Sequence, residues 1–210
     1  NAVTGSAGSE LLFGLARTIF RAQANNDWIK RRRWDIETRL APFVLGETSR
    51  SAQMNKSVAQ INGPTVPTHA DILHEYFVAP DRFAEFIQVC RQIIPASQQD
   101  LLNVTLRWIE QDPNSLLSYA PNGPRIAAVM NFGQELTQTA EDDAILMTRR
   151  LIDAVHDLGG SYYLPYRPHA TAAQFATGYA KAEEFASLKR RYDPRLLFTN
   201  ALWDKYLAGY

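Results

Sequence analysis

The sequence has one cysteine, Cys90, among its 210 residues. A single cysteine cannot form an internal disulfide bond, and it excludes metal sites built from several cysteines. Histidine is sparse as well: the four histidines stand far apart, and no His-x-x-x-His or Glu-x-x-His pair occurs. The spacing of these residues therefore predicts no metal site. The cysteine content does not indicate a cellular compartment, because a lone thiol is compatible with any compartment.

Neither sign of charge is in excess, because 22 lysines and arginines balance 22 aspartates and glutamates. A neutral chain is not expected to hold nucleic acid or an anionic membrane surface by bulk charge. No apolar run approaches the ~20 residues that a membrane-spanning helix needs. Hydrophobic residues make up 46% and aromatic residues 11% of the chain. That composition is enough to bury a core, so we expect a folded protein.

Motifs of self-contained enzymes are also missing. The glycines Gly46, Gly63, Gly123 and Gly133 stand singly, so there is no glycine-rich phosphate loop. Ser161 lies between Gly-Gly and Tyr-Tyr, which is not the turn that exposes a catalytic serine. Residue spacing alone therefore indicates no specific catalytic chemistry and predicts only an α+β domain with a polar sheet face.

The middle of the chain alternates between strand and helix patterns. Residues 101–110 are the clearest strand, because their apolar and polar side chains alternate. Proline and glycine mark helix ends: Pro80 and Pro95 bound one helix, and Gly159-Gly160 ends another. The predicted elements are strand 71–79, helix 81–94, strands 101–110 and 125–132, helix 139–158 and strand 161–167.

These elements read β-α-β-β-α-β, the ferredoxin-like arrangement of an α+β fold. Right-handed crossovers place both helices on one face of a four-stranded antiparallel sheet. The other face is here termed the open face. We expect this domain to span residues 70–170. Residues 1–69 are expected to form a helical leader, with a break near residues 25–27, and an irregular connector. Residues 171–210 are expected to form C-terminal helices and a tail.

Alternation along the strands predicts which side chains the open face carries. On the second strand the apolar side, which includes Leu106, belongs to the helices. The first strand is ambiguous, because both of its sides are apolar; His74 and Tyr76 share one of them. The open face then carries polar and aromatic residues: Asn103, Thr105 and Arg107 from the second strand, Ala127, Val129 and Asn131 from the third, and Tyr162, Leu164 and Tyr166 from the fourth.

A face of this composition is typical neither of a core nor of an ordinary solvated surface. It suits the wall of a polar pocket. A solvated face with a few aromatic residues, or a homodimer interface, is equally compatible with the pattern.

Four motifs near the C-terminal end are more specific: a Gly-Gly pair before an aromatic strand, Ala-Thr-x-x-Gln-Phe at 170–175, Lys-Arg-Arg-Tyr-Asp-Pro at 189–194, and Leu-Phe-x-Asn at 197–200. Together they resemble the C-terminal end of FAD-linked oxidoreductases of the vanillyl-alcohol oxidase/p-cresol methylhydroxylase superfamily. The members most similar in appearance are the aldonolactone and sugar-alcohol oxidases and decaprenylphosphoryl-ribose oxidase. Residues 73–80 also resemble the first strand of that family's cap domain.

In that family a ferredoxin-like cap covers the flavin, and an N-terminal domain binds FAD. The resemblance implies that this chain is the cap, that FAD is bound mainly by a domain not present in it, and that the chain alone is inactive. The implied reaction is hydride transfer from a hydroxyl-bearing carbon of a small alcohol or sugar-like substrate to flavin N5. The alternative is a stand-alone ferredoxin-like binding module that dimerises through its open face.

The resemblance also implies roles for individual residues. Arg107 is a partner for the flavin N1–C2=O region or a substrate oxygen, and Tyr166 and His169 are candidate bases. Several relatives carry Glu in place of Thr105 and Lys in place of Tyr166. The substrate-binding candidates are His74, Tyr76, Thr105, Val129, Asn131 and Tyr163, and the cofactor-binding candidates are Arg107 and Asn200. No residue is assigned to a metal.

Overall fold

The computed structural model describes Thr18, residues 22–40 and residues 68–210. The chain divides into two compact units, residues 1–67 and 68–210. The second unit carries the sheet and every candidate site residue.

Helix α2, Asp27–Asp35, is the main described element of the first unit. It begins where the sequence predicts a break: Asn25 has a left-handed φ of 54°, and the Asn26 side chain caps the helix by accepting from the Ile29 N–H. A π-helical turn, Ile36–Leu40, follows. The rest of the predicted leader, and nearly all of the connector, lie outside the described residues.

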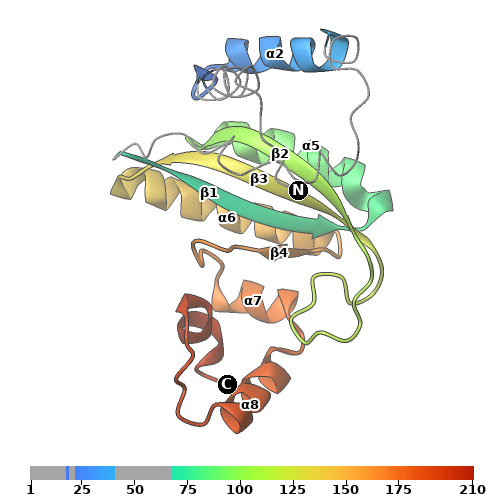
Figure 1. Ribbon diagram of the computed structural model, residues 1–210, viewed down its shortest axis with the longest axis vertical. Helices are drawn as coiled ribbons and strands as arrows, with labels where there is room; N and C mark the ends of the chain where they lie inside the picture. Colours follow the sequence, from blue (N-terminus) through green and yellow to red (C-terminus); the bar gives the residue numbers. More distant parts are fainter. Residues whose placement is uncertain (1–17, 19–21, 41–67) are drawn as a thin grey trace, which may run out of the picture. The chain divides into compact units, whose positions relative to one another are not determined.

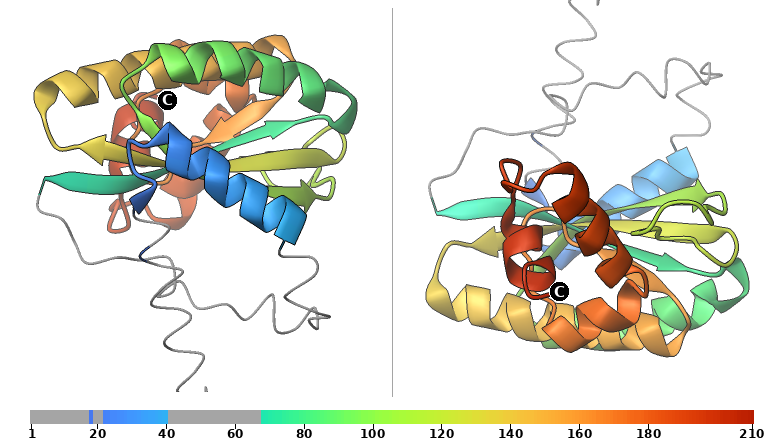
Figure 2. Two further views of the ribbon diagram at one scale, coloured as in Figure 1. Left: turned by 90° about the horizontal axis from the view of Figure 1, so that it is seen from above. Right: turned by 90° about the horizontal axis from the view of Figure 1, so that it is seen from below.

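The second unit is an α+β domain with a four-stranded antiparallel sheet (Figure 1). Its strand order, β2-β3-β1-β4, is that of a ferredoxin-like sheet, and Figure 2 shows α5 and α6 on the same face. The predicted fold class is confirmed. The elements are β1 (His69–Val78), α5 (Phe83–Ile93), β2 (Asp100–Ile109), β3 (Arg125–Glu135), α6 (Gln138–Asp157) and β4 (Ser161–Tyr163).

The core lies between the sheet and helices α5 and α6. Phe86 of α5 packs against Tyr76 of β1, with 5.7 Å between ring centroids. Leu151 and Ile152 of α6 are fully buried in the same cluster. Thr137 caps α6 by accepting from the Ala140 N–H.

The predicted burial of the second strand is wrong in part. Val104, Leu106 and Trp108 do pair with core-facing residues of β3, but Leu106 and Trp108 are 55% and 58% exposed. The reason is that β2 is an edge strand, whereas Phe86 of α5 packs on Tyr76 of the inner strand β1. A β-bulge between Leu101 and Asn103 further changes the alternation, and Leu102 lies near Gly133 on the open face.

The fourth strand is shorter than predicted, because it ends at Tyr163 instead of residue 167. Pro165 has no N–H to donate to the ladder, and the chain leaves the sheet there. Tyr166 therefore lies in a loop, outside the sheet.

The C-terminal residues form α7 (Ala172–Gly178), α8 (Ala182–Tyr192) and a π-helical turn, Trp203–Leu207. Figure 1 shows α7 next to β4. Trp203 and Tyr206 are buried, and the Tyr206 ring stacks on Phe175 of α7 at 4.5 Å. The Tyr206 hydroxyl donates to the Ala170 carbonyl at 2.9 Å. The tail is thus fastened to α7 and to the segment that follows β4.

The turn after α6 depends on a glycine at residue 160. A Cβ there would lie 2.4 Å from the Phe77 carbonyl oxygen and 2.8 Å from Val155 Cγ2. Since backbone cannot move aside cheaply, we expect Gly160→Ala to reduce the free energy of unfolding by about 2–3 kcal/mol or more. Urea unfolding measures this. Gly209→Ala is the control, because no atom lies within 4 Å of its Cβ position; equal losses for both variants would contradict the prediction.

Candidate functional site

The pairing register defines the open face as three rows that cross the sheet. Five predicted site residues lie in these rows: Arg107, Thr105, Val129, Asn131 and Tyr163. The rows are Asn103–Asn131–Leu73, Thr105–Val129–Glu75–Tyr163 and Arg107–Ala127–Phe77–Ser161.

Polar atoms on this face lack structural partners. No described residue forms an ion pair or hydrogen bond with Arg107, which is exposed. The Asn131 Oδ1 atom is buried and has no hydrogen-bond partner. Asn103 Nδ2 donates to Thr105 Oγ1 at 3.3 Å. The exposed Arg107 guanidinium is therefore free to contact another molecule, whereas the Asn131 carbonyl is a buried acceptor without a partner.

Glu75 is a residue of this face that sequence reasoning missed. It pairs with Val129 on one side and with Tyr163 on the other. Burial raises the pKa of the nearby Tyr119 phenol, and Tyr163 and the Glu75 charge act in the same direction. The alternation of β1 does put Glu75 on the opposite face from His74 and Tyr76. However, the sequence did not show which of the two faces of β1 the helices cover.

The loop between β2 and β3 closes one end of the open face. Tyr119 from this loop stacks on Phe77 at 4.5 Å with nearly parallel rings, and lies 5.6 Å from the Tyr163 ring. Ser161 Oγ donates to the Tyr119 carbonyl at 2.8 Å. The row that contains Asn103 and Asn131 lies toward the opposite end of the strands.

His74 and Tyr76 do not lie on the open face, so the structure does not bring them together with the other candidate substrate-binding residues. Both are buried on the side that the helices cover, where the His74 ring packs against Phe132 at 5.1 Å. The Tyr76 hydroxyl is 3.3 Å from His74 Nδ1. Burial lowers the pKa of His74 to about 3 and raises that of Tyr76. Both residues therefore stay neutral and belong to the core.

His169, the second candidate base, is also on the helix side, so the structure does not bring it together with Arg107 on the open face. The chain leaves the sheet at Pro165 and packs His169 against α6. There His169 Nε2 lies 2.9 Å from Glu141 Oε1, and Arg149 Nε donates to the His169 carbonyl at 3.0 Å. Burial lowers the pKa of His169, and the Glu141 carboxylate opposes that shift.

Glu141 connects several buried polar groups. Burial alone would raise its pKa, but hydrogen bonds from His169 and Gln134, together with the Arg167 charge, hold it below its ordinary value. Arg167 forms an ion pair with the same carboxylate. The cluster ties β3, α6 and the segment after β4 together, so its evident role is structural.

Tyr166 and Asn200 lie with Tyr163 around a cavity of about 210 Å³ between β4 and the C-terminal tail. Tyr166 is exposed. Asn200 Oδ1 accepts from the Trp203 N–H at 2.9 Å. This bond caps the last helical turn, so the acceptor atom of Asn200 is already in use.

In the part of the chain that the structure describes, no group of three His, Cys, Asp or Glu side chains could hold a metal ion. Within the same residues, no helix combines the length and apolar character needed to cross a membrane. A scan against protein-family models finds no match, and a search of curated proteins finds no similar sequence.

Proposed function

We propose that this chain is the substrate-binding cap of an FAD-linked oxidoreductase, with the open face as the roof of the pocket. The observation that carries the proposal is a ferredoxin-like sheet with one face covered by helices, while its other face holds the unpaired Arg107 and Asn131. Unpaired polar groups grouped on one face are typical of a surface that meets a ligand.

The motifs that suggest the family have local structural reasons. Gly160 permits the close approach of Phe77 to the turn after α6. Thr171 and Gln174 form the capping box of α7. Asp193 pairs with Lys189 and accepts from the Leu197 N–H. These residues support a shared fold, whereas the chemistry depends on the open face.

The open face fits a flavin placed against it by another domain. A bound flavin would supply a hydride acceptor. The Arg107 guanidinium is a permanent cation with donors only, which suits a carbonyl oxygen that gains negative charge. Asn131 Oδ1 is an acceptor without a partner, which suits a hydrogen bond donated by a substrate hydroxyl. With His169 on the helix side, Glu75 in the central row is a carboxylate of this face that can take the hydroxyl proton.

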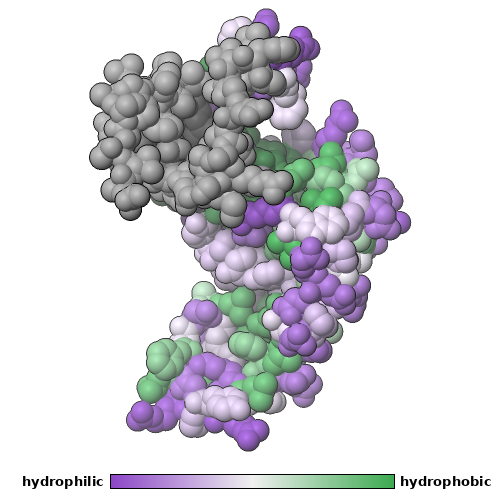
Figure 3. Space-filling view, turned by 45° about the vertical axis from the view of Figure 1, so that its right-hand side comes forward, coloured by the Kyte–Doolittle hydropathy of each residue, from purple (hydrophilic) through white to green (hydrophobic). Residues whose placement is uncertain are grey.

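A partner domain is also supported by exposed apolar residues in the tail. Tyr192 and Phe198 are 78% and 81% exposed, and Leu197 lies beside them in sequence. Figure 3 shows hydrophobic residues on the surface of the C-terminal part. Such residues, when grouped, mark interaction surfaces. An FAD-binding domain is the partner that the proposal requires.

We expect the 210-residue chain to be purified colourless and without dehydrogenase activity, because no described segment offers a glycine-rich cradle for the FAD diphosphate. The visible absorption spectrum after gel filtration tests this. Stoichiometric flavin in this chain would contradict it.

The protein encoded by the natural reading frame that includes these residues should be yellow. Alcohols or sugars should reduce its flavin in the absence of oxygen. A colourless full-length protein that dimerises through the open face would favour the binding-module alternative.

A further inference from the structure

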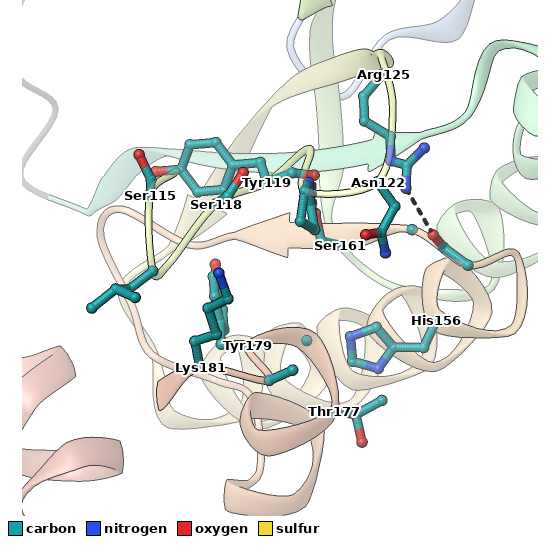
Figure 4. A pocket seen from close by; sticks show the side chains of 16 residues that line it. Ser115, Ser118, Tyr119, Asn122, Arg125, His156, Ser161, Thr177, Tyr179 and Lys181 are labelled. Atoms are coloured by element: carbon teal, nitrogen blue, oxygen red, sulfur yellow. Dashed lines mark hydrogen bonds between the residues drawn. The ribbon is translucent and has the colours of Figure 1, made fainter. Parts of the chain in front are cut away.

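A second cavity, of about 360 Å³, adjoins one end of the open face, with which it shares Tyr119 and Ser161. Its walls come from three places: the loop between β2 and β3, the end of α6 with the glycines that follow it, and the junction between α7 and α8. Figure 4 shows Arg125 and Asn122 on one side of this cavity and His156 and Thr177 on the other.

Charge in the cavity has one sign. Arg125 and Lys181 are among its sixteen lining residues, and none of the sixteen is an aspartate or glutamate. Asp112 is one acidic group near the cavity: hydrogen bonds from Ser115 are the main reason that its pKa is lowered, and the Lys181 charge adds to this shift. However, Asp112 does not line the cavity and forms no ion pair with Lys181 among the described residues.

The main observation is that the Arg125 side chain is buried without a described acidic partner. It is only 9% exposed, and no described carboxylate pairs with it. Its Nη1 and Nη2 atoms reach the Pro124 and Gly159 carbonyls at the long distances of 3.3 and 3.4 Å. Its Nε atom is buried and has no partner. A buried guanidinium without an anion is costly, so a bound anion would offset that cost.

His156 adds a second unpartnered atom on the opposite wall. Its Nε2 is buried and has no hydrogen-bond partner. The site of a Cβ on Gly178 lies 3.1 Å from this atom, so a larger residue at 178 would crowd the ring. Burial lowers the pKa of His156, while Asp153 and Asp157 on the same helix act in the opposite direction. A neutral ring with its proton on Nε2 can donate to a ligand.

We propose that this cavity binds a small anion that carries a carboxylate or a phosphate group. Arg125 offers planar donors, which match two oxygen atoms of either group. Lys181 adds charge at the mouth, and His156 and Asn122 add neutral donors. The volume suits a compact metabolite, because it is at the lower end of the range for ligand pockets. This proposal does not depend on the flavin, since Arg107 and Asn131 do not line this cavity.

The test uses the 210-residue chain with inorganic phosphate, malonate and uncharged glycerol as probes in isothermal titration calorimetry. Saturable binding of phosphate, malonate or both, but not of glycerol, is expected, and comparing the two anions distinguishes a phosphate from a carboxylate site. Arg125→Gln should weaken binding by roughly tenfold or more, and Lys181→Gln by roughly threefold. Arg91→Gln, on the exposed side of α5, is the matched control and should bind normally.

A second measurement covers the case in which Arg125→Gln unfolds. Only four histidines occur, so the side-chain nitrogen signals of His156 can be resolved by NMR. The anion should shift these signals in the wild-type chain, and less so in Lys181→Gln at the same concentration. If neither anion binds, the proposal is overturned. It is also overturned if Lys181→Gln leaves the affinity unchanged and the anion does not move the His156 signals.

Discussion

Under the proposed function, Arg107→Ala should slow flavin reduction in the full-length protein by roughly a hundredfold and leave the melting temperature nearly unchanged. The side chain is exposed on the open face and holds no described partner, so its loss removes no core contact. In a pocket closed by substrate and flavin, loss of one charge-assisted hydrogen bond costs about 3 kcal/mol in the transition state. Stopped-flow reduction and thermal unfolding separate the two effects.

Two controls make this result interpretable. Leu151→Ala should lose about 2–5 kcal/mol of stability and keep its rate while folded, because Leu151 is fully buried under the sheet. Arg91→Ala removes the same charge from α5 and should change neither quantity. If Arg107→Ala reduces its flavin at the wild-type rate, the open face is not the roof of the pocket.

Acid should destabilise the chain strongly as the pH falls from about 6.5 towards 3. Burial lowers the pKa of His74 in the folded state to about 3, whereas the unfolded residue keeps its ordinary value of 6.5. Below pH 6.5 the unfolded state therefore takes up a proton that the folded state refuses. As the pH is lowered through this window, the free energy of unfolding falls by an amount on the order of 4 kcal/mol. Above the window the contribution of His74 is constant.

Urea unfolding at a series of pH values measures this slope. His74→Phe should flatten it, even though the Tyr76 hydroxyl loses its partner and the stability at neutral pH falls. Some slope will persist, because burial also lowers the pKa of His156 and His169. His69→Gln is the control, since His69 is exposed near Glu135. An unchanged slope in His74→Phe would contradict the assignment.

The order of elements was predictable because it depends on local signals. Pro80, Pro95 and the glycines after α6 mark helix ends, and alternation marks β2. The right-handed crossover rule then leaves few topologies. The strand order β2-β3-β1-β4 follows from those signals with no knowledge of long-range contacts.

The site was harder to predict. The face of the sheet on which a side chain lies, and the strand that forms the edge, both depend on packing across the sheet. Both sides of β1 are apolar, so the sequence could not tell that Tyr76 would meet Phe86 and that Glu75 would face outward. The bulge at Leu102 and the departure of the chain from the sheet at Pro165 also depend on packing across the sheet. A one-residue shift in either place moves a side chain to the other face. The placement of Arg107, on a cleanly alternating strand, did not suffer from this ambiguity.

The burial of Trp203 gives the molecule an internal fluorescence probe. Of its four tryptophans, Trp28, Trp34 and Trp108 are exposed, whereas Trp203 is 4% exposed in the last turn of the tail. Because Trp203 packs near Lys189 and Arg190 of α8 and not in the sheet, its emission reports the docking of the tail. Circular dichroism reports the sheet and the helices together. Transitions that coincide in both signals would mean that tail and sheet unfold as one cooperative unit.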